Sequence, residues 1–165
     1  MTATDQARKL AAIAAIAADR MKGEDIQVLD VSGPLVITDV FVLISADNER
    51  LVNAIVDEVE DDLRDAGAKP VRREGVREGR WALLDYGTFV VHVFRHEERE
   101  FYGLDRLWKD CPLIEVEGVE QRSPLSHGSG SLRDTAEEGH VDVARVATDI
   151  DQIPLAGEGP DAGEL

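Results

Sequence analysis

The sequence predicts a small α/β domain built on a mixed β-sheet with flanking helices. Segments in which apolar residues recur at helical spacing alternate along the chain with short runs rich in β-branched residues. The run over residues 40–44 is wholly apolar and too short for a helix, which is typical of a central strand covered on both faces. Two later runs flank a glycine turn and predict an antiparallel hairpin. The resulting element order is α-β-β-α-β-β-β-α.

The first two elements are a helix over residues 5–22 and a strand over residues 26–31. Gly23 stands where a glycine commonly ends a helix, and the Ser-Gly-Pro sequence at residues 32–34 ends the strand. The residues expected on the buried face of this helix are Leu10, Ile13, Ala14, Ala17 and Met21.

The second helix is expected to be capped by Asp47 or Asn48 and to end at Gly67. Its outer face is densely acidic, as solvated helix faces commonly are. Residues 69–73 are expected to form a short edge strand, and residues 74–80 a polar loop. The apolar stripe of the helix consists of Val52, Ile55, Val56, Val59 and Leu63.

The hairpin over residues 81–94 is the segment whose strand pairing and buried faces the sequence predicts in most detail. With Gly87 and Thr88 as its loop residues, Tyr86 faces Phe89, and the register of every other pair follows. A loop shifted by one residue would change these partners. One face of the hairpin then holds Trp81, Leu83, Asp85, Val90, His92 and Phe94. The other face holds Ala82, Leu84, Tyr86, Phe89, Val91 and Val93.

A third helix is expected over residues 97–109. Glu97 and Glu98 suit the positive end of its dipole, and Cys111 followed by Pro112 ends it. The residues expected along its apolar side are Phe101, Leu104 and Trp108.

Charge and composition exclude several classes of function. The 165 residues carry a net charge of −16, which argues against binding to nucleic acid or an anionic membrane through phosphate neutralisation. A basic macromolecular partner is therefore expected. No apolar run is long enough to span a membrane, and no signal peptide is evident. A single cysteine, Cys111, excludes an internal disulfide and fits a cytoplasmic protein.

The composition changes near residue 115. All of the aromatic residues precede this point, whereas residues 115–165 hold 12 acidic and three basic side chains. A segment without aromatic residues buries too little surface to offset the entropy of ordering its backbone. We therefore expect a folded domain over residues 1–114 and a mostly disordered acidic tail over residues 115–165, in which residues 141–150 could become helix or strand on binding.

Few residue patterns suit catalysis. Asp85 and His92 are diagonal neighbours on one hairpin face, where a carboxylate could orient an imidazole as a general base. The alternative is that His92 is a strand histidine whose ring bonds a neighbour. Ser45 lies outside a nucleophile elbow, and no phosphate-binding glycine loop occurs. His92 and His96 straddle a strand end, so no metal site is expected.

Three linked motifs resemble the ribosomal silencing factor family (Iojap/RsfS). They are Thr-Asp-Val-Phe-Val at residues 38–42, Trp-Ala-Leu-Leu-Asp-Tyr-Gly at residues 81–87 running into residues 90–94, and the segment at residues 99–108. The resemblance covers residues 5 to about 114. It departs from the family at residues 45–49 and at Cys111, where alanine is usual.

The resemblance implies a nucleotidyltransferase-like scaffold that lacks catalytic residues and uses no cofactor. It also implies binding to the large ribosomal subunit through ribosomal protein L-fourteen. The bound protein would block association with the small subunit and repress translation when nutrients are limiting. One alternative is an enzyme, either a degenerate nucleotidyltransferase or a hydrolase that uses His92 and Asp85. Another is a homo-oligomer, such as a homodimer, formed through an exposed tryptophan or hairpin edge.

The family motifs also indicate where such a partner would bind. Tyrosine and tryptophan are the usual anchors of protein interfaces, although some of these side chains must lie in the core. The expected partner-binding residues are Trp81, Leu83, Asp85, Tyr86, His92, Tyr102, Leu104, Asp105 and Trp108.

Overall fold

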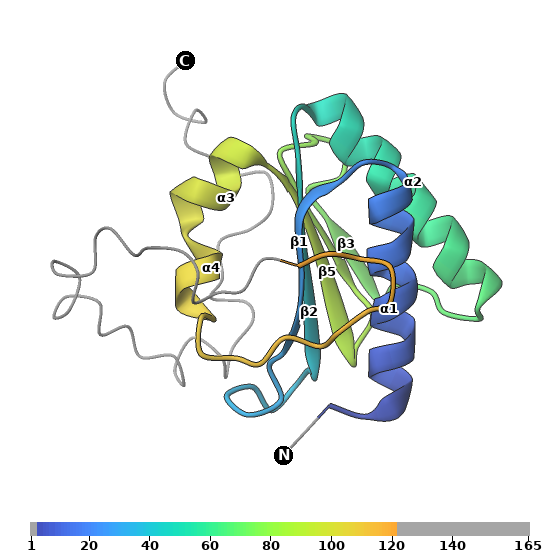
Figure 1. The fold of residues 1–165 in the computed structure, drawn as a ribbon. Coiled ribbons are helices and arrows are strands. Elements are labelled where there is room, and N and C mark those ends of the chain that lie inside the picture. Colours follow the sequence, from blue (N-terminus) through green and yellow to red (C-terminus); the bar gives the residue numbers. More distant parts are fainter. Residues whose placement is uncertain (1–2, 122–165) are drawn as a thin grey trace, which may run out of the picture.

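A computed structural model describes residues 3–121 as one five-stranded sheet with helices on both faces. The strand order is β1-β2-β5-β4-β3, in which only the β2–β5 pair is parallel. The helices α1 and α2 cover one face, and α3 and α4 cover the other (Figure 1). The predicted mixed sheet with flanking helices is confirmed. The elements are α1 (Asp5–Arg20), β1 (Glu24–Asp30), β2 (Val40–Ala46), α2 (Glu49–Asp65), β3 (Arg72–Glu74), β4 (Trp81–Asp85), β5 (Phe89–Arg95), α3 (His96–Tyr102) and α4 (Leu104–Leu107).

The β4–β5 hairpin has the predicted register. Trp81 pairs with Phe94 and Asp85 with Val90, and the Tyr86 amide donates to the Phe89 carbonyl at 2.9 Å. Gly87 sits in the loop at φ 89°, a conformation that glycine adopts without strain. The predicted division of the hairpin into two faces is confirmed, because the two sets of side chains lie in separate cores.

The first core lies between the sheet and the α1–α2 layer. The predicted stripe of α2 is fully buried there, and Asn48 caps the helix by accepting from the Leu51 amide at 2.8 Å. The predicted face of α1 is wrong in part, because Leu10, Ile13 and Met21 are only partly buried. Small side chains let α1 approach its neighbours closely. The buried residues of α1 are Ala7, Ala11, Ala14, Ala15, Ala17 and Ala18.

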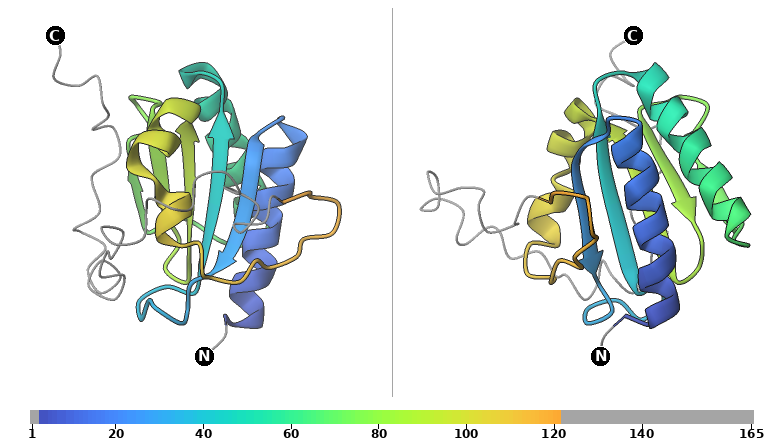
Figure 2. Two further views of the ribbon diagram at one scale, coloured as in Figure 1. Left: turned by 60° about the vertical axis from the view of Figure 1, so that its left-hand side comes forward. Right: turned by 45° about the vertical axis from the view of Figure 1, so that its right-hand side comes forward.

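The second core lies under α3 and α4, the layer seen in two orientations in Figure 2. The predicted single helix over residues 97–109 is two helices, because Gly103 ends α3 in the left-handed conformation at φ 62°. Phe101, expected on the apolar side, is 60% exposed, whereas Trp108 is buried. None of the helices in residues 3–121 is long and apolar enough to cross a membrane.

Residues 112–121 run along the free edge of β1. The Asp30 amide donates to the Pro112 carbonyl, and the Ile114 amide donates to the Val28 carbonyl. Figure 1 shows this segment passing from α4 across β1 towards α1. Ile114, Val116 and Val119 lie in the first core, so packed structure continues past the boundary expected at residue 114. The expectation for residues 141–150 lies outside the described residues.

Candidate interaction surface

Four of the expected contact residues lie in the second core rather than at the surface. Trp81 and His92 are 0% exposed, Trp108 is 1% exposed and Leu83 is 4% exposed. The Trp81 Nε1–H donates to His92 Nδ1 at 3.1 Å, and the Phe41 ring lies edge-on to both His92 and Trp108. The sequence left open which aromatic residues are core. The structure places these four beneath the surface, where they support the residues above them.

The expected pairing of His92 with Asp85 is not formed. The Asp85 carboxylate accepts from the Gly87 amide at 2.8 Å and so fixes the hairpin turn. Burial, and to a lesser degree the Arg99 charge, lower the pKa of His92 to about 3. The imidazole is therefore neutral near pH 7, and within residues 3–121 no carboxylate orients it as a general base.

Tyr86 faces the first core. Its ring stacks on Phe89 with centroids 4.7 Å apart, and burial raises its phenol pKa to about 12. Tyr86 is 9% exposed and lies on the hairpin face opposite Asp85. A partner that contacts Asp85 therefore meets Tyr86 only at the strand end.

On the α3 side of the sheet, aromatic and charged side chains lie at the solvent-exposed surface. Phe101 is exposed, and the half-buried Tyr102 packs against Phe101 at 4.9 Å and against Trp81 at 4.6 Å. Arg72 pairs across the strands with Asp85, which places both side chains on this face. We call Asp85, Phe101 and Tyr102 the α3 border. Leu104 and Asp105 belong to α4, and their side chains lie outside the described set.

Buried charges hold α3 on the sheet. Glu98 is 0% exposed and forms a two-point ion pair with Arg95, at 2.8 and 2.7 Å. Arg99 is 6% exposed and donates to the Ser45 hydroxyl, the Gln27 side chain and the Asp25 carbonyl. The sequence reading placed Glu98 at the helix dipole and missed this network. The only available signal was a run of charges directly after a buried strand.

Nucleophiles are poorly placed for catalysis. The Ser45 hydroxyl is 0% exposed and accepts from Arg99, and burial together with the Asp30 and Asp110 charges raises the pKa of Cys111 to about 11. A hollow of about 430 Å³ opens at the start of α2, lined by residues 47–50 and Arg95, and includes none of the expected site residues.

The structure covers most of the surface expected to support self-pairing. Both tryptophans are buried, β5 pairs with β2 along its whole length, and β4 pairs with β3 over residues 83–85. The structure also groups Asp47, one of the two candidate caps of the second helix, with side chains from two other elements. Among the described residues, Asp47 forms the one group of three side chains arranged as metal ligands, together with Glu24 and His96.

Known proteins share this sequence and fold. The family model "Ribosomal silencing factor during starvation" matches residues 4–139. The chain is 39% identical over 110 residues to the ribosomal silencing factor RsfS of Bacillus subtilis, which covers 66% of this chain and 93% of that protein. A crystal structure of a Chromobacterium violaceum protein matches with a TM-score of 0.60 at 30% identity, over 72% of this chain and 97% of that one. A second crystal structure, from Bacillus halodurans, matches with a TM-score of 0.56 at 35% identity, over 63% and 94%.

Proposed function

The chain belongs to the ribosomal silencing factor family, and from that premise we propose that it represses translation by keeping the ribosomal subunits apart. It binds the large subunit in the cytoplasm through ribosomal protein L-fourteen and blocks association with the small subunit when nutrients are limiting. The family match over residues 4–139 is the observation that carries this proposal. The protein acts by occupying a surface, which requires neither turnover nor a cofactor.

The charge of the chain supports a protein contact on the ribosome rather than an RNA contact. A net charge of −16 is repelled by RNA phosphates and attracted to basic ribosomal proteins. Complementary charge accelerates such an encounter, and buried aromatic anchors then slow dissociation.

The α3 border is the surface we assign to this contact. Phe101 and Tyr102 supply exposed and half-buried aromatic area, and Asp85 supplies a carboxylate on the same side of the sheet. Leu104 and Asp105 follow directly in the chain and are assigned to the same contact. The second core supports this border rigidly, since Tyr102 packs directly on Trp81.

The test is a subunit profile of associated ribosomes incubated with saturating purified protein. The expected result is a shift towards free subunits, with the protein sedimenting beside the large one. Phe101→Ala and Asp85→Lys should each weaken this binding. Asp85→Asn removes the negative charge but keeps the hydrogen bond that holds the hairpin turn, because the asparagine side-chain oxygen can still accept from the Gly87 amide.

Two variants on the opposite layer serve as matched controls. Ile16→Ala removes a partly exposed apolar side chain from α1, and Asp57→Lys reverses an exposed charge on α2. Both should bind like the unmodified protein. An unchanged subunit profile would contradict the proposed function. Equal losses in the test and control variants would contradict only the assigned surface.

A further inference from the structure

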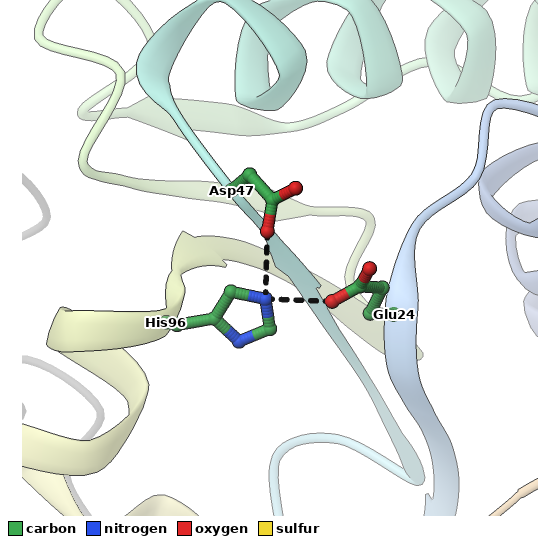
Figure 3. Close-up of side chains that lie close together, drawn as sticks. All are labelled: Glu24, Asp47 and His96. Atoms are coloured by element: carbon green, nitrogen blue, oxygen red, sulfur yellow. Dashed lines mark hydrogen bonds and ion pairs between the residues drawn. The ribbon is translucent and has the colours of Figure 1, made fainter.

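Three side chains from distant parts of the sequence meet at one end of the sheet. Glu24 begins β1, Asp47 follows the last residue of β2, and His96 follows the last residue of β5. The strands β1, β2 and β5 are neighbours, and their register brings these positions together, because Glu24 pairs with Ser45 and Ala46 pairs with Arg95. The backbone of the sheet therefore sets the spacing of the three side chains, which Figure 3 shows pointing towards one another.

The donor atoms have the spacing of a coordination site. His96 Nε2 lies 2.8 Å from Glu24 Oε1 and 3.3 Å from Asp47 Oδ1, and all three ligand atoms fall within 4.8 Å of one another. A tetrahedral zinc site with ligand bonds of about 2.1 Å has ligand-to-ligand distances of about 3.4 Å. Small rotations of these partly exposed side chains reach that geometry. We propose that Glu24, Asp47 and His96 form a binding site for a divalent transition-metal ion.

Electrostatics favours an ion over a simple hydrogen bond. A single imidazole nitrogen faces two carboxylates, and one N–H can donate well to only one of them. Among the residues that the structure describes, His96 is the one ion-pair partner of Asp47 and of Glu24. A divalent cation neutralises both carboxylates at once and accepts the imidazole lone pair.

The ligand set selects the kind of ion. Imidazole nitrogen suits zinc and similar transition metals, whereas magnesium and calcium prefer sites made of oxygen ligands alone. All three side chains are partly exposed, with exposed side-chain fractions of 54% for Glu24, 67% for Asp47 and 39% for His96. Water can therefore complete the coordination, as in zinc sites with three protein ligands.

An ion at this point connects the start of α3 to β1 and β2. The helix α3 also carries Phe101 and Tyr102 of the α3 border. The ion would thus hold the first turn of this helix against the sheet end. The site itself does not depend on the proposed function, since it rests on three residues outside the α3 border.

The experiment is isothermal titration of the chelator-treated full chain with Zn²⁺, followed by the same titration with Mg²⁺. The expected result is one Zn²⁺ bound per chain, with much weaker Mg²⁺ binding, and a melting temperature that rises with Zn²⁺. Glu24→Gln, Asp47→Asn and His96→Gln should each weaken Zn²⁺ binding at least ~10-fold, since even outer-shell substitutions commonly cost that much.

Two controls make the result specific. Glu97→Gln changes an exposed glutamate beside His96 and should leave Zn²⁺ affinity unchanged. The double variant His127→Gln/His140→Gln removes the histidines outside the described residues and should also retain the site. Circular dichroism checks that each variant is folded. Absence of Zn²⁺ binding, or binding that survives all three ligand substitutions, would overturn the proposal.

Discussion

Replacing Trp81 by phenylalanine separates a core role from a contact role for this residue. The indole is 0% exposed, and its Nε1–H is the hydrogen-bond partner of His92 Nδ1. Phenylalanine has no donor, so the imidazole nitrogen is left buried and unpaired, which costs about 1–3 kcal/mol. The lost ring contacts with Tyr102 and Phe94 add about 1 kcal/mol. The expected total is about 3 kcal/mol.

Urea unfolding measures this loss directly. With an m-value of about 2 kcal/mol/M, a loss of about 3 kcal/mol lowers the midpoint by about 1.5 M. Phe101→Ala is the matched aromatic control, because this side chain is 60% exposed and surface substitutions usually change stability by at most about 0.5 kcal/mol. Its midpoint should move by no more than about 0.3 M.

Binding supplies the second half of the test. At a temperature where both variants are folded, Trp81→Phe should retain its affinity for the large subunit, whereas Phe101→Ala should lose affinity. The reasoning is refuted if Trp81→Phe unfolds at the same urea concentration as the unmodified protein. It is also refuted if folded Trp81→Phe loses more binding than Phe101→Ala.

Three further substitutions test the packing and electrostatics. Burial depresses the pKa of His92 from 6.5 to about 3, so its neutral form contributes full stability above about pH 6.5, and this contribution falls as the pH drops towards 3. Between pH 6.5 and pH 5 the unmodified protein should lose up to about 2 kcal/mol of unfolding free energy relative to His92→Phe; parallel pH curves would contradict this. Glu98→Ala removes the two-point ion pair with Arg95, which keeps its longer contacts to Glu49 and Glu97, and should cost about 1.5–3 kcal/mol in chemical denaturation. The exposed Glu97→Ala should cost less than about 0.5 kcal/mol. Gly23→Ala places a Cβ 2.8 Å from Ile44 Cγ2 and should lower the free energy of unfolding by about 1–3 kcal/mol. The control Gly33→Ala places its Cβ more than 4 Å from any other atom and should not destabilise the protein. Equal melting temperatures for the two variants would contradict the overpacking explanation.

Local patterns predicted the elements whose geometry is set locally. The glycine at residue 87 fixed the hairpin register, and the spacing from Val52 to Leu63 identified the buried stripe of α2. The same spacing rule was right for Ala14 and Ala17 of α1 but wrong for its larger apolar residues. There the alanine face packs inward and Leu10 lies at its margin, because close approach of the helix favours small side chains. Gly103 was a visible signal for the break between α3 and α4.

The candidate site was harder to predict because its exposure depends on the tertiary layers. Both faces of the hairpin are covered, so strand periodicity could not show that Trp81 is a core residue. Nor could it show that Phe101, in the following helix, is exposed. The burial of Arg99 depends on strands far away in the sequence, because its guanidinium donates to Ser45 on β2 and to Gln27 on β1. The meeting of Glu24, Asp47 and His96 depends on the strand order, which the sequence did not specify.

The strip of chain over residues 112–121 covers a sheet edge of the kind through which proteins polymerise. The Gln121 side chain accepts from the Val28 amide at 2.7 Å and donates to the Ile114 carbonyl. It therefore forms hydrogen bonds with backbone groups that would otherwise be free to pair with another molecule. A shortened version cut at residue 114 would lose this closure together with Val116 and Val119. Its uncovered strand would be a template for fibril-like stacking of identical copies, and truncations intended for crystallisation should retain residue 121.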